Sequence, residues 1–168
     1  MLNLGDAYRR ILALFTDKPS NFSWVDERVA ASGRPMTMKQ LEWIKSQGID
    51  AILSLTEHPL PGEWVERLGI EYMHFPIEDH SAPDPETLKE IVDRVLALVS
   101  GGRRLLIHCA AGLGRTGTVL AAYLVASKGV SGEEAIKAVR KLRPGSIERA
   151  QEISIIEFQR RYFPKAAP

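Results

Sequence analysis

Residues 108–118 read His-Cys-Ala-Ala-Gly-Leu-Gly-Arg-Thr-Gly-Thr. This segment lies between a short apolar run, residues 105–107, and a run that is apolar nearly all round, residues 116–128. The first run predicts a buried strand and the second a buried central helix. Such a junction points backbone N–H groups and the positive end of the helix dipole at one small volume. Because the glycines at 112, 114 and 117 permit a tight wrap of the chain, we expect a nest of amides that binds a phosphate dianion.

Cys109 lies at the mouth of this expected nest. A free thiol is only a few per cent ionised at neutral pH, but a helix N-terminus and a nearby guanidinium both stabilise the thiolate. Arg115 follows six residues later, and its planar fork can hold two phosphate oxygens. The hydroxyl of Thr116 can donate to the sulfur and so help the thiolate to depart when a covalent intermediate breaks down.

The composition indicates one ordinary globular domain, residues 1–168. The chain is 45% hydrophobic and 26% charged, with a net charge of +1, which gives no reason to expect nucleic acid or a membrane surface as a partner. Its single cysteine excludes an internal disulfide. Residues 1–15 read as an amphipathic helix in which Asp6, Arg9 and Arg10 interrupt any signal-peptide core. We therefore expect a cytoplasmic monomer.

Strand patterns alternate with helix patterns along the chain, which predicts an α/β fold with a central, mostly parallel sheet flanked by helices. The helical last third of the chain is expected to pack on the sheet. Asp84 followed by Pro85 predicts a helix start, with the aspartate as N-cap. Strands are expected within residues 25–31, 51–55, 70–77 and 105–107, and helices at 37–47, 61–68, 84–99, 116–128, 132–142 and 147–161.

The run Cys109-x5-Arg115-Thr116, preceded by His108, resembles the signature of the protein tyrosine phosphatase superfamily. The wider string is similar to the compact dual-specificity branch, including the small archaeal and atypical enzymes. Residues 24–25, 33–35, 53–57 and 142–148 also resemble segments of such domains. The resemblance covers about residues 22–163, which we expect to form the catalytic core, with residues 1–20 as a helical extension. It implies hydrolysis of phosphotyrosine, or of phosphoserine and phosphothreonine, through a cysteinyl-phosphate intermediate.

The resemblance also implies where phosphorylated proteins or peptides, and phosphate-like or sulfate-like anions, bind. The expected binding positions are Ala110, Ala111, Gly112, Leu113, Gly114 and Arg115. In the family, an upstream aspartate protonates the leaving group, and the candidates here are Glu78, Asp79 and Asp84. We favour Asp79 because it follows a strand end, whereas Asp84 is better explained as a helix cap.

Supporting roles are less sharply indicated. His108 is expected to be a partly enclosed strand histidine that orients the loop through hydrogen bonds. Glu148 and Gln151 are alternatives for positioning the attacking water, although both could simply begin the last helix. His58, His74 and His80 show no metal-ligand spacing, so we expect neither a metal nor another cofactor.

Three alternatives remain open at this point. Gly112-x-Gly114-x-x-Gly117 matches a dinucleotide-binding fingerprint, with Glu133 and Glu134 near the position of the ribose-binding acid. A non-catalytic phosphate-binding module would use the same amides. A phosphoinositide or inositol phosphate substrate is disfavoured, because members of the family that act on such lipids often carry lysines where this loop is apolar.

Overall fold

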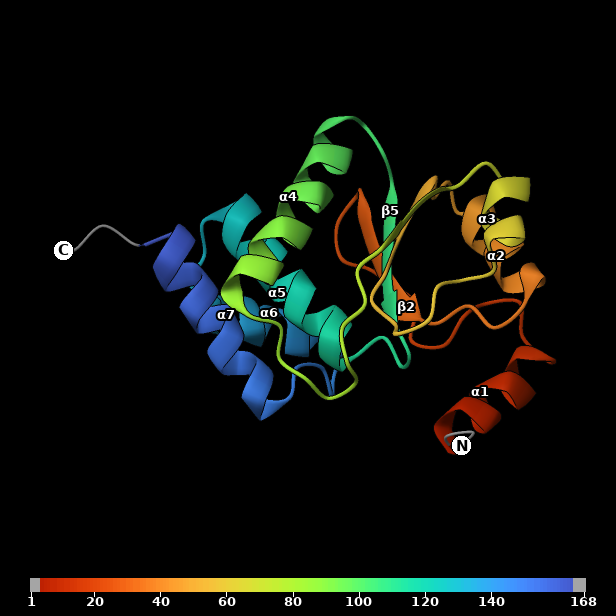
Figure 1. Cartoon of the computed structure of the whole chain (residues 1–168), viewed down its shortest axis with the longest axis horizontal. Helices are drawn as coiled ribbons and strands as arrows, with labels where there is room; N and C mark the ends of the chain where they lie inside the picture. The colour runs from red at the N-terminus through yellow and green to blue at the C-terminus, as the bar shows by residue number, and fades with distance from the viewer. Residues whose placement is uncertain (1–3, 165–168) are drawn as a thin grey trace.

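The computed structural model describes residues 4–164, in which a five-stranded sheet separates two groups of helices (Figure 1). The strand order is β1-β2-β5-β3-β4. β1 pairs antiparallel with β2, and every other neighbouring pair is parallel, which confirms the expected fold class. The strands are Ser23–Trp24 (β1), Val29–Gly33 (β2), Ala51–Ser54 (β3), Glu71–His74 (β4) and Leu105–Cys109 (β5).

Helices cover both faces of this sheet (Figure 1). α4 and α5 pack against β5, while α6 and α7 pack on α5 and α4 behind them. The helical last third of the chain therefore packs on the sheet, as predicted, through α5. The helices are Leu4–Ala13 (α1), Met38–Ser46 (α2), Gly62–Arg67 (α3), Pro85–Ser100 (α4), Gly114–Lys128 (α5), Gly132–Leu142 (α6) and Arg149–Tyr162 (α7).

The side chains on the two faces of the sheet belong to two separate hydrophobic clusters. Leu105 and Ile107 of β5 join the cluster that contains residues of α4–α7, whereas Leu106 joins the cluster with residues of α2 and α3. Alternate side chains of a strand point to opposite faces, so both faces of β5 are buried. A parallel sheet needs this two-sided cover, and the continuous apolar runs in the sequence follow from it.

Two helices begin at different residues from those predicted. α5 starts at Gly114, two residues earlier than expected, because its first turn is part of the loop that follows β5. α7 starts at Arg149 instead of residue 147. Ile147 has a φ of 64°, which no helix accommodates, and Glu148 is the N-cap. By contrast, Asp84 caps α4 as predicted, accepting a hydrogen bond of 2.7 Å from the backbone N–H of Thr87.

The chain after β4 stays beside β3, although β4 itself is shorter than the predicted strand 70–77. The N–H of Phe75 donates to the carbonyl of Ser54 at 2.9 Å, and the N–H of Ile77 donates to that of Leu55 at 3.1 Å. Residues 78–83 are therefore delivered to the carboxyl end of the sheet, where β5 also ends. Ligands of open α/β sheets bind at this edge.

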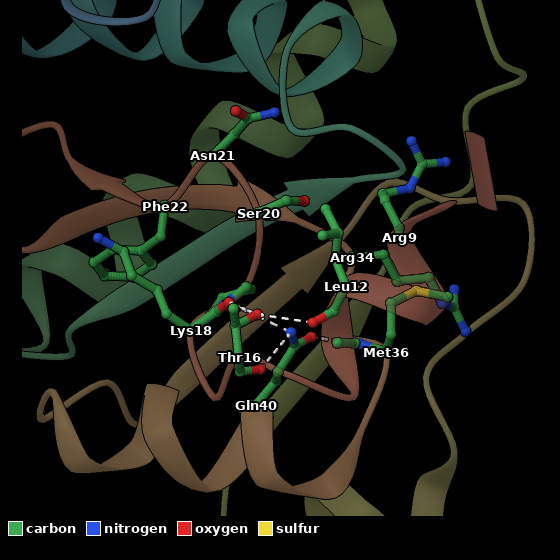
Figure 2. Close-up of a pocket in the computed structure, with 12 residues that line it drawn as sticks. Arg9, Leu12, Thr16, Lys18, Ser20, Asn21, Phe22, Arg34, Met36 and Gln40 are labelled. Carbon is green, nitrogen blue, oxygen red and sulfur yellow. Dashed lines mark hydrogen bonds between the residues drawn. The ribbon is translucent and has the colours of Figure 1, made fainter. Parts of the chain in front are cut away.

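The first helix, α1, lies to one side of the sheet (Figure 1). It frames a pocket of about 360 Å³ with Thr16, residues 18–22, Arg34, Met36 and Gln40 (Figure 2). The Gln40 amide donates to the carbonyls of Thr16, at 3.3 Å, and Lys18, at 3.4 Å. Much of the apolar side of this region is exposed: Leu4, Tyr8, Ile11, Leu14 and Phe15. No helix within residues 4–164 is long and apolar enough to cross a membrane.

Candidate active site

Residues 109–115 form a loop between β5 and the first turn of α5. Its tight path depends on Gly112, which has a φ of 76°. A Cβ atom there would lie 2.3 Å from the carbonyl carbon and oxygen of Ser32, so no other residue fits without moving the backbone of β2. The N–H of Gly112 donates to Sγ of Cys109 at 3.2 Å. Cys109 is buried, with only 3% of the residue's surface exposed.

Three carbonyl groups of this loop point away from its centre, and this explains why the amides that follow them point toward the centre. The carbonyl of Ala110 accepts from the N–H of Arg34 at 3.0 Å, and that of Ala111 from the side chain of Asn21 at 2.8 Å. The carbonyl of Gly112 accepts from Arg143 at 2.6 Å. In a trans peptide the C=O and the following N–H point in opposite directions, so each outward carbonyl turns the next amide inward. The loop thus has the form of a cradle for an anion, and the binding of an anion there stays a prediction.

Arg143 is the main support of this cradle outside the loop. It is 4% exposed and also donates to the Ser23 hydroxyl and, at 3.4 Å, to the carbonyl of Ala31. Burial holds its pKa below the usual arginine value, while the negative charge of Cys109 acts in the opposite direction. The sequence contained Arg143 in a segment that resembles the family, but the pattern gave it no role.

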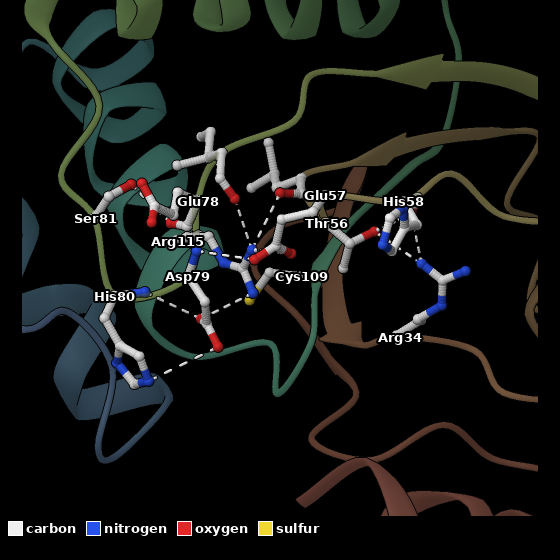
Figure 3. A network of polar contacts seen from close by, with 12 residues as sticks. Arg34, Thr56, Glu57, His58, Glu78, Asp79, His80, Ser81, Cys109 and Arg115 are labelled. Carbon is white, nitrogen blue, oxygen red and sulfur yellow. Dashed lines mark hydrogen bonds and ion pairs between the residues drawn. The ribbon is translucent and has the colours of Figure 1, made fainter. Parts of the chain in front are cut away.

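The guanidinium of Arg115 lies beside Cys109 (Figure 3). Arg115 is 2% exposed, and its Nη1 donates to the carbonyl of Ile77 at 2.7 Å and to Oε2 of Glu57 at 2.9 Å. Nη2 is 2.9 Å from Oδ1 of Asp79. Burial acts to lower the pKa of Arg115, but Glu57 and the charges of Cys109 and Asp79 outweigh burial and raise it. The cation is therefore fixed at the mouth of the cradle.

Of the three candidate acids, Asp79 is the one whose carboxylate contacts Arg115. Its carboxylate meets Arg115, and its backbone N–H donates to Oε1 of Glu57 at 3.0 Å. Glu57 therefore holds both Arg115 and the acid loop, although it is not among the predicted site residues. Asp84 is occupied as the cap of α4, where its bonds with Thr87 lower its pKa. Glu78 has no described contact with the cradle.

Glu148 and Gln151 both lie next to the cradle. A Cβ atom on Gly114 would be 3.3 Å from the Gln151 amide and from Oε1 of Glu148. The Gln151 side chain accepts from the N–H of Glu148 at 2.8 Å, and it donates to the carbonyl of Ser81 at 3.0 Å. These residues begin α7, and they also lie beside the loop, so the positioning of a water by either of them stays a prediction.

Two expected details of the cradle differ in the structure. His108 is fully buried, not partly enclosed, and its Nδ1 lies 3.3 Å from the carbonyl oxygen of Cys109. Burial is the main reason why its pKa falls to about 3, so this histidine is neutral. The hydroxyl of Thr116 is buried without a hydrogen-bond partner, so the expected bond to the sulfur is not formed in this structure.

Among residues 4–164 no three His, Cys, Asp or Glu side chains are grouped as metal ligands.

The dinucleotide alternative is inconsistent with the topology. β5 leads into α5 and α5 leads into α6, and no described strand follows. A dinucleotide-binding unit requires a further parallel strand after that helix. The glycines of residues 112–117 thus belong to a single-phosphate cradle at the carboxyl end of the central strand. This cradle, with Cys109 and Arg115 side by side on a largely parallel sheet, is the arrangement that the resemblance to the protein tyrosine phosphatase superfamily implies.

Comparison with known proteins gives the family. Residues 19–156 match the family described as Swiss Army Knife protein, DSP-PTPase phosphatase domain (PTP-SAK), and the chain belongs to it. The crystal structure of Tk-PTP in the active form is similar, with a TM-score of 0.77 and 36% identity over 84% of this chain and 97% of that one. These findings confirm the resemblance to compact dual-specificity phosphatases.

Two curated relatives are longer proteins. Tyrosine-protein phosphatase CDC14 of Saccharomyces cerevisiae is 29% identical over 67% of this chain and 20% of its own length. Protein tyrosine phosphatase domain-containing protein 1 of Bos taurus is 31% identical over 84% of this chain and 20% of its own length. The chain thus spans about a fifth of the length of these curated relatives.

Proposed function

We propose that the protein is a cysteine-dependent phosphatase that hydrolyses phosphotyrosine, and also phosphoserine and phosphothreonine, in proteins or peptides. The convergence of Cys109, Arg115 and Asp79 on one cradle carries this proposal. A non-catalytic binding module would need the amides and the cation, but it would need neither the sulfur at the base nor the acid at the mouth. The family membership of residues 19–156 supports the same reaction.

The first step transfers the phosphoryl group to sulfur. The Cys109 thiolate attacks phosphorus in line, the bond from phosphorus to the leaving oxygen breaks, and Asp79 gives its proton to that oxygen. Arg115 and the inward amides of Ala111, Gly112 and Leu113 hold the equatorial oxygens as negative charge spreads over them. Because these donors are already fixed by Glu57 and by the outward carbonyls, little reorganisation is required during the step.

The second step releases inorganic phosphate. Water attacks phosphorus, the phosphorus–sulfur bond breaks, and the Asp79 carboxylate accepts the proton of the water. We propose that Glu148 or Gln151 orients this water, since both side chains lie beside Gly114 of the loop. The hydroxyl of Thr116 has no hydrogen-bond partner. If it turned toward the sulfur, it would stabilise the departing thiolate. The reaction needs a reduced Cys109, so a reducing compartment such as the cytoplasm suits the protein.

We propose a phosphoprotein substrate instead of a phosphoinositide. Phosphoinositide headgroups carry several negative charges, and this loop offers the apolar side chains of Ala110, Ala111 and Leu113 where lysines would neutralise them. A structure of PTPMT1 in complex with PI(5)P is similar to this chain in fold, at 23% identity. The lipid therefore belongs in any substrate panel as the competing possibility.

We propose that residues 22–163 hold the catalytic core and that residues 1–20 are an extension. The contacts at the junction support a boundary near residue 20. The carbonyl of Ser20 accepts from the N–H of Gly33 at 2.7 Å, and the Asn21 side chain holds the carbonyl of Ala111. The extension therefore ends where direct support of the cradle begins.

The decisive experiment compares wild type with Cys109→Ser on phosphopeptides and on inositol phosphates. Wild type is expected to release phosphate from phosphotyrosine peptides, and rapid acid quenching during turnover is expected to trap one phosphoryl group per chain on cysteine. Cys109→Ser is expected to bind the same peptides without turnover. Phosphate release by Cys109→Ser at the wild-type rate would refute the mechanism, and exclusive release from inositol phosphates would refute the substrate class.

A further inference from the structure

His80 lies between the two carboxylates at the mouth of the cradle. Its Nδ1 is 2.8 Å from Oε1 of Glu148. Its Nε2 is 3.7 Å from Oδ2 of Asp79, a contact that Figure 3 shows. The ring is thus a bridge between the loop that carries the proposed acid and the first residue before α7. Nothing in the sequence pattern assigns a role to this histidine.

The backbone at His80 indicates that the arrangement is specific. Its φ is 60°, a conformation that costs most non-glycine residues about 1 kcal/mol or more and that asparagine, aspartate and histidine adopt most readily. In this conformation the N–H of His80 donates to Oδ1 of Asp79 at 3.1 Å. The backbone and the ring of one residue therefore both face the acid.

Other contacts hold the rest of the same loop on α7. The Gln151 side chain donates to the carbonyl of Ser81, and the hydroxyl of Ser154 donates to that of Pro83. These two bonds fix the later part of residues 78–83 but reach neither oxygen of Asp79. The bridge through His80 is the described tie between α7 and the carboxylate itself.

Binding of a phosphate makes this tie important. Arg115 now holds Oδ1 of Asp79, but a phosphate dianion that receives two bonds from Arg115 draws that cation away from the acid. Once Arg115 is engaged by the substrate, His80 and the backbone N–H contact with Glu57 remain to orient Asp79.

We propose that His80 is a positioning residue that, through its contact with Glu148, aims the carboxyl group of Asp79 at the leaving oxygen. This inference rests on the proposed function, because it takes Asp79 as the general acid. His80 does not itself exchange a proton with the substrate. Its effect is therefore confined to steps in which the acid takes part.

The charged groups around the ring make the tie dependent on pH. The ring faces Asp79 on its own loop, Glu148 before α7 and Arg115 on α5. The hydrogen bond with Glu148, followed by the charge of Asp79, raises the pKa of His80 above 6.5, against the smaller opposing effect of Arg115. A raised pKa means that the protonated bridge is complete at lower pH and is lost as the pH rises through that value.

Two variants separate the tie from the strain of the backbone. His80→Ala removes the ring at a backbone conformation that alanine adopts poorly. His80→Asn keeps a residue that accepts this conformation, and it places an amide nitrogen near the position of Nδ1, which can still donate to Glu148. His58→Asn is the matched control, an exposed histidine on the loop between β3 and α3.

The test uses two phosphate esters whose leaving groups differ in acidity. The phenol of phenyl phosphate needs a proton from Asp79 to leave, whereas the umbelliferone of a difluorinated umbelliferyl phosphate leaves readily without one. We expect His80→Ala to lower kcat/KM for phenyl phosphate about tenfold, which is a fraction of the full effect of a general acid. For the umbelliferyl ester, whose leaving group is more acidic, we expect kcat/KM to fall less than about twofold. His80→Asn is expected to recover only the part of the loss that backbone strain and the contact with Glu148 cause, because asparagine has no counterpart of the Nε2 that faces Asp79. Orthovanadate is expected to inhibit all variants at wild-type concentrations.

The outcomes distinguish this inference from the proposed function. An equal fall for both esters, or no fall for either, would overturn the positioning role of His80 while leaving the phosphatase intact. Absence of hydrolysis by wild type, or full activity of Cys109→Ser, would instead overturn the proposed function. Ring titration by NMR gives a second readout that does not need turnover. Glu148→Gln is expected to lower the pKa of His80, and an unchanged value would contradict the bridge.

Discussion

Arg115 and Asp79 form an ion pair at the mouth of the cradle, with Nη2 of the arginine 2.9 Å from Oδ1 of the aspartate. The two groups have different partners during the proposed reaction, because the phosphate takes the arginine and the leaving oxygen takes the proton of the aspartate. The acid thus competes with the substrate for the cation that binds the substrate. Glu57 moderates this competition, since it holds Nη1 of the same guanidinium and the backbone of the same aspartate.

Asp79→Asn separates chemistry from binding. We expect kcat/KM for phenyl phosphate to fall by about 10²–10⁴-fold, the usual contribution of a general acid. The affinity for orthovanadate is expected to stay the same or to increase, since a carboxylate that competes for Arg115 has been removed. Inhibition constants and steady-state rates measured on one preparation check both parts. Full activity of Asp79→Asn would exclude Asp79 as the acid and would return attention to Glu78.

Glu57→Gln tests whether one carboxylate organises both the cation and the acid loop. The oxygen of the glutamine side chain can still accept from the N–H of Asp79. Its NH2 group would then face Nη1 of Arg115, and two hydrogen-bond donors cannot bond to each other. We expect weaker orthovanadate binding and a lower kcat/KM for both acidic and weakly acidic leaving groups. Loss for the weakly acidic group alone would show that Glu57 serves the acid loop and not the arginine.

The same carboxylate gives a direction for the dependence on pH. Partial burial raises the pKa of Glu57, but its own backbone N–H, Arg115 and the N–H of Asp79 outweigh burial and lower it. With a lowered pKa in the folded state, the contact with Arg115 is complete above the ordinary carboxylate range and is lost as the pH falls through the folded value. We expect orthovanadate affinity of wild type to drop on that acidic side, and that of Glu57→Gln to change less there.

Most of the fold and the centre of the site could be predicted, because they depend on local patterns. Apolar runs, caps and glycines identified the strand and helix on either side of Cys109, and a fixed spacing placed Arg115 at the loop. The supports at Glu57, His80, Asn21 and Arg143 could not be found in this way. Asn21 precedes β1, Glu57 follows β3, His80 follows β4 and Arg143 is the C-cap of α6. Their roles therefore depend on which segments, distant in sequence, meet at the loop. His108 shows the same limit, since the apolar run at residues 105–107 predicted the strand but did not reveal how completely both of its faces are covered.

Gly112→Ala and Gly69→Ala separate a steric requirement from a conformational one. Both glycines have positive φ, 76° and 59°, so alanine is strained at either position. A Cβ at Gly69 would meet nothing within 4 Å, whereas one at Gly112 would strike the backbone of Ser32. We expect Gly69→Ala to cost about 1 kcal/mol of unfolding free energy and to keep activity. Gly112→Ala is expected to cost more and to lose orthovanadate binding, and equal effects in denaturant titrations and binding assays would refute the steric argument.

His108 gives the protein a specific loss of stability in acid. Burial, only partly offset by the contact with the Cys109 carbonyl, lowers the pKa of this histidine to about 3 from the 6.5 expected of an unfolded chain. Between these two values His108 is protonated in the unfolded chain but neutral in the folded chain. Stability from this group is therefore complete above pH 6.5 and decreases as the pH falls, by up to about 1.4 kcal/mol for each pH unit.

Urea titrations from pH 8 to pH 4 measure this dependence. His108→Gln has no titrating group at the position, so its unfolding free energy is expected to fall less steeply between pH 6.5 and pH 4, whatever its value at pH 7. His58→Gln is the control for replacing an exposed histidine by glutamine. If His108→Gln does not fold, the wild-type protein still decides the question by NMR. The ring of His108 is expected to show no titration from pH 8 to pH 4, and a midpoint near pH 6 would contradict its burial as a neutral imidazole behind Cys109.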